Sequence, residues 1–146
     1  MENKKKMTLN DVPGGYGMCT RDDCPVCNHC LRHMAFQEVE KDLRFVYHVN
    51  PLRVEPSEKC EYFRSDELAT YARGFTKMQQ EMIPRQYQTF SVRLIGKFGR
   101  TGYFERRRGE RLCTPSEIAA IRNVLREIGL PELEFDGYLK QYNWTD

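Results

Sequence analysis

Residues 19–30 read Cys-Thr-Arg-Asp-Asp-Cys-Pro-Val-Cys-Asn-His-Cys, which places four cysteines within twelve residues. A fifth cysteine, Cys60, follows thirty residues after Cys30. Thiolates suit zinc, and a structural zinc site often joins two closely spaced cysteines to ligands from elsewhere in the chain. The Cys24–Cys27 pair has the spacing of such a knuckle, and Cys60 is a plausible remote ligand. We therefore expect a metal site that holds the N-terminal half together.

Five cysteines for four zinc positions leave one thiol spare, and other interpretations stay open. Cys24, Cys27 and Cys30 fit the C-x2-C-x2-C run of bacterial ferredoxins, so an iron–sulfur cluster completed by Cys60 is the strongest rival. A redox dithiol at Cys24 and Cys27 is a second rival, and a set of buried, unligated thiols is a third. We interpret the two histidines of this region, His29 and His33, as a partly exposed pair rather than as ligands.

Length and composition are those of an ordinary globular protein. The chain has 146 residues, of which 40% are hydrophobic and 30% are charged, so it suits one domain or one domain with a small metal-stapled lobe. No apolar run approaches the roughly 18 residues of a spanning helix. The N-terminus has no apolar stretch typical of a signal peptide. We expect a cytoplasmic protein with no membrane partner, in which clustered cysteines are metal ligands more often than disulfides.

Local signals predict a mostly α fold with a minor β element, in three parts. We expect a flexible tail over residues 1–15, a cysteine-rich metal-binding lobe over residues 16–64 and a bundle of four or five helices over residues 65–146. In the lobe, a helix is predicted from about residue 28 to 39, and the aromatic and β-branched residues 43–49 predict a strand.

The predicted bundle is read from apolar stripes at helical spacing and from end signals. One helix is expected over residues 65–82, a second from Pro84 to Gly99, and a short basic helix that stops at Gly109. Thr114-Pro115 starts a further helix, because Thr caps it and Pro suits the first helical position. Gly129 ends that helix, and a last short helix is expected around residues 138–142.

The chain also resembles a family of short uncharacterised bacterial proteins. The motifs that carry the resemblance are Cys19-x4-Cys24-Pro-x4-Cys30-Leu-Arg-His, Asn50-Pro51, Cys60-x-Tyr62-Phe63, Gly96-Lys-Phe-Gly-Arg-Thr, Arg107-Arg-Gly-Glu-Arg, Phe135-Asp-x-Tyr138 and Tyr142-x-Trp144. They span nearly the whole chain. The resemblance implies that Zn²⁺ is held by Cys19, Cys24, Cys30 and Cys60, with Cys27 as the spare thiol. It implies no activity, because the family has no established function.

A basic segment is hidden in a chain whose net charge is only +2. Residues 85–111 carry eight Arg and Lys against two Glu, a net charge of +6. The order of predicted helices around it resembles the helix-turn-helix of phage-type repressors, although the turn after Gly99 is about two residues shorter than in that pattern. In this interpretation, the residues on or near the nucleic-acid face are Arg100, Thr101, Tyr103, Arg106, Arg107, Arg108 and Arg111.

No motif points to an enzyme. The sequence has no P-loop, no G-x-G-x-x-G, no H-E-x-x-H and no G-x-S-x-G, and a site of four cysteines has no open position for a substrate. We expect no catalysis and no small-molecule substrate. The leading hypothesis is a small intracellular, zinc-stabilised binding protein of regulatory role that contacts nucleic acid through its basic helical segment. The alternatives are a protein–protein interaction scaffold with a structural zinc, and an iron–sulfur or thiol redox sensor.

Overall fold

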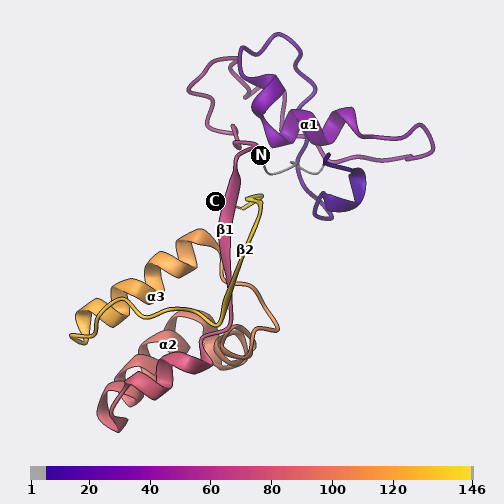
Figure 1. Ribbon diagram of the computed structural model, residues 1–146. Helices are drawn as coiled ribbons and strands as arrows, with labels where there is room; N and C mark the ends of the chain where they lie inside the picture. Colours follow the sequence, from indigo (N-terminus) through magenta and orange to yellow (C-terminus); the bar gives the residue numbers. More distant parts are fainter. Residues whose placement is uncertain (1–5, 146) are drawn as a thin grey trace. The chain divides into compact units, whose positions relative to one another are not determined.

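The computed structural model describes residues 6–145 and divides at Leu68 into two units (Figure 1). Unit 1 contains the described residues up to Glu67 together with residues 143–145, and unit 2 contains residues 68–142. The division lies close to the boundary that the sequence predicts between residues 64 and 65. Residues 143–145 belong to unit 1, whereas the sequence predicts that they belong to the helical domain.

The fold is mostly helical with a minor β element, as predicted. The α-helices are α1 (Leu31–Gln37), α2 (Pro84–Arg108) and α3 (Pro115–Glu127), the 3-10 helices are η1 (Leu9–Asp11), η2 (Cys27–His29) and η3 (Thr76–Glu81), and the strands are β1 (Leu68–Arg73) and β2 (Gly137–Tyr142). Within the described residues, no helix combines the length and the apolar character needed to cross a membrane.

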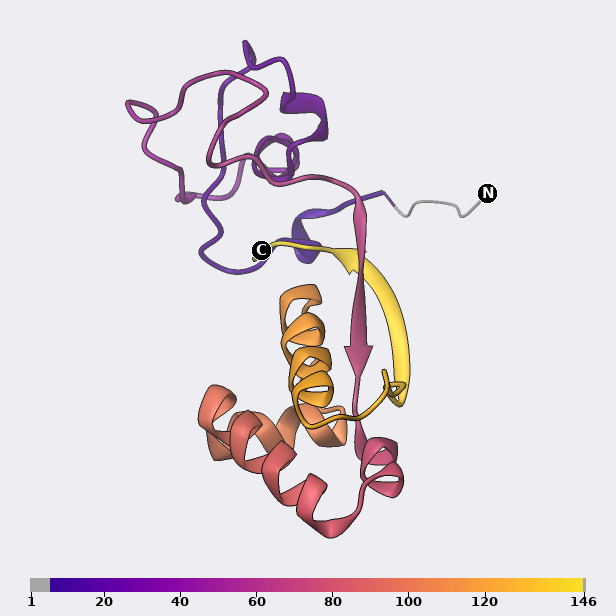
Figure 2. The ribbon, with the colours of Figure 1, turned by 90° about the vertical axis from the view of Figure 1, so that its left-hand side faces the viewer.

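The two strands form an antiparallel ribbon that corrects two helix predictions. Leu68 pairs with Tyr142 and Arg73 with Gly137, and Figure 2 shows the strands side by side. The predicted helices over residues 65–82 and around 138–142 are therefore wrong. The apolar spacing of the first segment suited a helix, but pairing with a distant strand overrode that local preference. Unit 2 thus packs α2, α3 and the short η3 with this ribbon, in place of the predicted four- or five-helix bundle.

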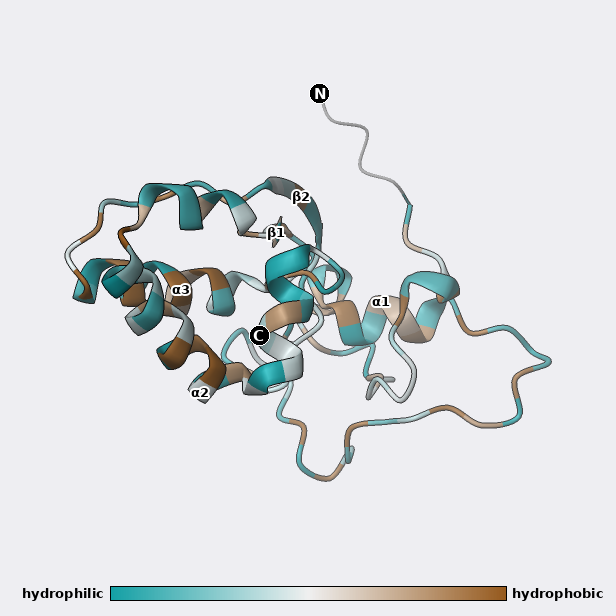
Figure 3. Ribbon diagram, turned by 90° about the horizontal axis from the view of Figure 1, so that it is seen from below, coloured by the Kyte–Doolittle hydropathy of each residue, from teal (hydrophilic) through white to brown (hydrophobic). Residues whose placement is uncertain are grey.

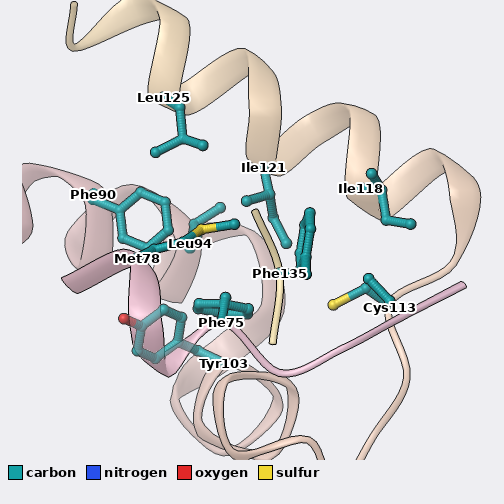
Figure 4. Packing of buried hydrophobic residues seen from close by; sticks show 11 residues of the cluster. Phe75, Met78, Phe90, Leu94, Tyr103, Cys113, Ile118, Ile121, Leu125 and Phe135 are labelled. Atoms are coloured by element: carbon teal, nitrogen blue, oxygen red, sulfur yellow. The ribbon is translucent and has the colours of Figure 1, made fainter. Parts of the chain in front are cut away.

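The core of unit 2 lies where α2 and α3 meet the β1 end and the segment before β2. Its buried residues are Ala72, Phe75, Met78, Phe90, Leu94, Tyr103, Cys113, Ile118, Ile121, Leu125 and Phe135. Figure 4 shows the side chains of α3 directed toward those of α2 and toward Phe75. The rings of Phe75 and Phe90 meet edge to face at 5.9 Å between centroids, a favourable aromatic geometry. Figure 3 shows apolar and polar residues alternating along both helices.

Of the helix ends predicted in unit 2, the start at Pro84, the stop at Gly109 and the start after Thr114 are confirmed. α2 begins at Pro84 and is capped by Gly109 in the left-handed conformation. It contains one break, because Gly99 has φ +75° and ψ 161°, a conformation that glycine adopts without steric cost. α3 begins after Thr114, whose hydroxyl accepts a hydrogen bond from the Glu117 backbone N–H at 3.2 Å.

Unit 1 contains little regular structure. The strand predicted over residues 43–49 is wrong: within the described residues, this segment forms only one isolated bridge, between Met18 and His48. A strand requires a longer partner than this. Part of the predicted tail is folded, since Met7 is buried and Leu9–Asp11 forms η1. Residues 1–5 of that predicted tail lie outside the described residues.

Candidate metal centre and basic surface

Helix α1 brings Cys30 to the chain segment that follows Cys60. Cys30 is the N-cap residue of α1 and forms an isolated antiparallel bridge with Ser65. The next residue, Leu31, donates its backbone N–H to the Arg64 carbonyl at 2.7 Å. Backbone hydrogen bonds therefore join the start of α1 to a segment that begins four residues after Cys60.

Arg32 connects the segments that carry Cys19 and Cys60. Its guanidinium donates to the Gly17 carbonyl and to the Tyr62 carbonyl, both at 2.8 Å. Its own carbonyl accepts the Cys19 backbone N–H at 3.1 Å. Charge-assisted hydrogen bonds of this kind are stronger than neutral ones. One arginine on α1 thus fixes the backbone on both sides of the cluster, a role that the sequence analysis missed.

The cysteines of unit 1 surround one small cavity. Its volume is about 20 Å³, enough for one water molecule or one ion. The residues that line it are Cys19, Arg21, Cys24, Val26, Cys27, Cys30, Arg32, His33, Cys60, Tyr62 and Phe63. The fold therefore gathers all four predicted ligands, including the distant Cys60, with the spare thiol of Cys27 beside them.

Three other thiols of the cluster act on the pKa of Cys19. Burial raises the pKa of the Cys19 thiol above its ordinary value, and a backbone hydrogen bond at Arg21 opposes that shift. The thiols of Cys30, Cys60 and Cys24 raise the Cys19 pKa further, because like charges close together disfavour ionisation. The residues that act on Cys19 in this way are the other three predicted ligands.

Cys27 is turned toward other partners. Its thiol is 3.9 Å from the Asp22 carbonyl and 3.9 Å from Asn28 Oδ1, both weak hydrogen bonds of sulfur to oxygen.

All six cysteines of the chain have free thiols. Within the described residues, no group of three or more His, Cys, Asp or Glu side chains is already arranged to hold a metal ion. Binding an ion at the cavity therefore requires the thiol side chains to rotate toward it.

The two histidines do not form the partly exposed pair that the sequence suggested. The His29 side chain is 75% exposed and lies 3.5 Å from the Asp66 carboxylate. The His33 side chain is only 3% exposed, and its Nε2 lies 3.2 Å from Asp22 Oδ1. The sequence signal that could have distinguished them is the Cys30-x2-His33 spacing at the start of a helix, which places both residues on one side of the first turn.

A family model described as "Family of unknown function (DUF6078)" matches residues 1–144. The chain belongs to this family. No curated protein and no solved structure was found to match the chain. Membership of DUF6078 assigns no activity, so the function has to be argued from the cavity and from the surface of the helices.

Two residues predicted to face nucleic acid are instead part of the folded interior of unit 2. Tyr103 is fully buried in the core. Arg106 stacks over the Phe98 ring at 4.3 Å and pairs with Glu117 at 2.7 Å, with only 12% of its side chain exposed. Both predictions for the binding face are therefore corrected, because a partner cannot reach side chains that the fold has covered.

Ion pairs with two glutamates of α3 offset two of the six net positive charges of the basic segment. The ion pairs that involve this segment join Arg93 to Glu127, Arg106 to Glu117, Arg108 to Glu110, and Arg111 to Glu105. Arg107 donates a hydrogen bond to the Gln79 side chain and lies over the Tyr87 ring. The paired Arg108 and Arg111 remain more than half exposed.

Two exposed cations with no ion pair among the described residues lie at the break in α2. Lys97 and Arg100 are exposed, and neither forms an ion pair with any described residue. Thr101 beside them is also exposed. Gly96 and Gly99 have open space where a side chain would be, so a partner can approach the backbone closely there. We call residues 96–101 the basic turn.

Proposed function

We propose that this protein is a small zinc-stabilised binding protein, and that it contacts nucleic acid through the basic turn. The metal assignment is supported by the gathering of Cys19, Cys24, Cys30 and Cys60 around one cavity. The nucleic-acid assignment is supported by the two unpaired cations beside the glycines of α2. The two assignments rest on different observations and are tested separately.

The small core of unit 1 supports the metal assignment. The buried hydrophobic residues in the described part of this unit are Met7, Met18, Cys30, Leu31, Ala35 and Val54. Its longest helix is the seven-residue α1, and isolated helices this short are marginal in water. Domains of this size commonly need a metal, a disulfide or a partner to stay folded. Free thiols around one cavity provide the ligands for a metal.

Metal content of freshly purified protein, measured with an absorption spectrum, tests the metal assignment. We expect one Zn²⁺ per chain and no visible colour, because Zn²⁺ has a filled d shell. Cys60→Ser should release the metal and destabilise unit 1, since metal-binding energy is folding energy. Cys27→Ser is the matched control and should retain the metal. Iron with broad visible absorption would favour the iron–sulfur alternative, and metal-free protein would contradict both.

Local structure and charge support a phosphate contact at the basic turn. A second helical segment starts after Gly99, and the first turn of a helix presents backbone N–H groups that attract anions. Lys97 and Arg100 flank this start and have no acidic group to neutralise them within the described residues. Cations of this kind bind phosphate and release counterions, which makes the affinity depend on salt. The exposed hydroxyl of Thr101 is a further donor to phosphate oxygen.

Fluorescence anisotropy with labelled DNA and RNA oligonucleotides at several salt concentrations tests this contact. We expect Lys97→Ala and Arg100→Ala each to weaken binding and to reduce the slope of log affinity against log salt by about 1. Arg126→Ala removes an exposed cation from α3 and serves as the charge-matched control. If all three substitutions weaken binding equally, the attraction of nucleic acid to the protein depends only on its overall charge. That result would contradict a binding site at the basic turn.

A protein–protein scaffold is the second candidate, because unit 1 exposes large apolar residues. Phe45 is 89% exposed and Leu52 is 94% exposed. Residues 43–49 have strand-forming composition but, in the part of the chain that the structure describes, pair only through the bridge at His48. A segment with an open edge can pair with the same segment of a second copy. Sedimentation velocity over a concentration series should then show a dimer that Phe45→Ser dissociates. A monomer at all concentrations would contradict this candidate.

A further inference from the structure

We propose that His33 is a ligand of the metal at the thiol cavity, through its Nδ1 atom. This inference rests on the metal assignment above and changes its donor set. The starting observation is the burial of His33, whose side chain is 3% exposed. Among the described residues, His33 is the one polar or charged residue that is buried. Buried polar groups are normally hydrogen-bonded or bound to metal.

The two ring nitrogens of His33 have different surroundings. Nε2 lies 3.2 Å from Asp22 Oδ1, whereas Nδ1 is buried and has no hydrogen-bond partner among the described residues. A carboxylate accepts hydrogen bonds, so Asp22 favours the tautomer with the proton on Nε2. Nδ1 then carries a lone pair, which is the form of a histidine nitrogen that binds metal.

The Asp22–His33 contact has the chemistry of a metal-site support. Histidine ligands usually donate their second ring N–H to a carboxylate or a carbonyl, which fixes the tautomer and makes the ligand more basic. Here the carboxylate is on Nε2, and the unpartnered nitrogen belongs to a residue that lines the thiol cavity. An unsatisfied buried lone pair is unfavourable in the folded chain, and coordination to a metal would satisfy it.

Sequence spacing places His33 next to a proposed thiolate ligand. His33 donates its backbone N–H to the Cys30 carbonyl at 3.1 Å, so both residues belong to the first turn of α1. Zn²⁺ in structural sites takes four ligands, and Cys3His sets are common. With His33 bound, the ion takes Cys60 and two of the three thiols of Cys19, Cys24 and Cys30, and the fourth thiol is left unbound.

NMR of ¹⁵N-labelled protein loaded with ¹¹³Cd²⁺ tests this inference directly. The chain has three histidines, namely His29, His33 and His48, so each ring can be assigned by substitution. We expect the Nδ1 signal of His33 to be split by one-bond coupling to ¹¹³Cd, with no splitting for the other two. Bound ¹¹³Cd without coupling to His33 would overturn the inference and leave the metal assignment standing, whereas absence of bound metal would overturn both.

Competition with a chromophoric chelator gives an independent readout with matched variants. His33→Ala should weaken Zn²⁺ binding at least tenfold, and Asp22→Asn, which removes the supporting carboxylate, should weaken it by about 10- to 100-fold. His29→Ala is the control, because that ring is exposed and lies against Asp66, and it should leave the affinity unchanged. Equal affinity of the His33→Ala and wild-type proteins would contradict a ligand role.

Discussion

At the scale of single residues, arginines that look alike in the sequence have different roles. Arg106 and Arg108 are two positions apart, and both pair with a glutamate. The Arg106–Glu117 pair is largely buried, with 12% and 16% of the side chains exposed, whereas Arg108 and Glu110 are 51% and 58% exposed. Arg106 also donates to the Gly102 carbonyl at 3.0 Å. The difference in burial therefore identifies Arg106 as a structural residue and Arg108 as a surface residue.

Arg106→Ala should destabilise the protein more than Arg108→Ala. The first substitution leaves the Glu117 carboxylate largely buried without its cation, which should lower the free energy of unfolding by about 2–4 kcal/mol. The second removes a solvent-exposed pair, which contributes little to stability, so its effect should be clearly smaller. Urea unfolding measures both, and equal losses would contradict the structural role of Arg106.

Gly74 is required by its backbone conformation and by its neighbours. It has φ +73°, and a Cβ atom built there would lie 2.7 Å from Asp136 Oδ2 and 3.3 Å from the Arg107 carbonyl. Gly74→Ala should therefore lower the free energy of unfolding by about 1–3 kcal/mol. Gly137→Ala is the control, because nothing lies within 4 Å of its Cβ position. Thermal melting should give similar melting temperatures for wild type and Gly137→Ala, and a lower one for Gly74→Ala.

At the scale of elements, the short helix η3 depends on a carboxylate from the segment before β2. Asp136 accepts hydrogen bonds from the Thr76 backbone N–H at 2.9 Å, from the Thr76 hydroxyl at 2.7 Å, and from the Lys77 backbone N–H at 3.1 Å. An anion at the start of a helix satisfies its free N–H groups. Asp136 thus connects the chain after β1 to the start of β2.

The stability that Asp136 contributes should depend on pH. Partial burial raises the pKa of this carboxyl, but the hydrogen bonds from Thr76 and Lys77 outweigh burial and lower the pKa below its ordinary value. The charged form is therefore the stabilising one. Its contribution should be complete above the unfolded-state pKa of about 4 and should be lost as the pH falls through the folded-state pKa.

Asp136→Asn and wild type should differ most in stability near neutral pH and should converge in acid. Denaturant unfolding from about pH 6 to about pH 2 measures the difference. Glu81→Gln removes an exposed carboxylate at the other end of η3 and should show no such convergence. A wild-type advantage over Asp136→Asn that is constant with pH would contradict the capping role.

At the scale of the whole molecule, the two units have different sources of stability. Unit 2 contains a shared aromatic and aliphatic core, whereas unit 1 contains few buried hydrophobic residues. Trp144, the only tryptophan, belongs to unit 1 and lies edge to face on Tyr16, with 4.9 Å between ring centroids. Its fluorescence therefore reports on unit 1, while far-ultraviolet circular dichroism reports mainly on α2 and α3.

Removal of the metal should unfold unit 1 before unit 2. We expect a chelator to shift the emission of Trp144 to that of exposed tryptophan and to leave most of the helical circular dichroism unchanged, because the core of unit 2 contains none of the proposed ligands. Cys60→Ser should reproduce this effect, and Cys27→Ser should not. Simultaneous loss of both signals would show that the units unfold as one, and no change in either would count against a structural metal.

Much of unit 2 was predictable because its signals are local. Pro84, Gly109, Thr114 and Gly129 act through their own backbone or through a neighbour within one helical turn, so the ends of α2 and α3 can be read from the chain. The family resemblance and the mostly α composition were likewise accessible. The ribbon of β1 and β2 was not, because its two strands are separated by the whole of α2 and α3.

The amphipathic helices, their caps and the thiols of the cluster follow directly from the order of residues along the chain. Which groups meet is set by the folded structure: it buries Arg106 and Tyr103, pairs β1 with β2, and gives His33 and His29 different surroundings. The physical reason is that propensity and capping act over a few residues. Burial, charge pairing and strand pairing depend on distant segments, whose approach is set by the free energy of the complete fold.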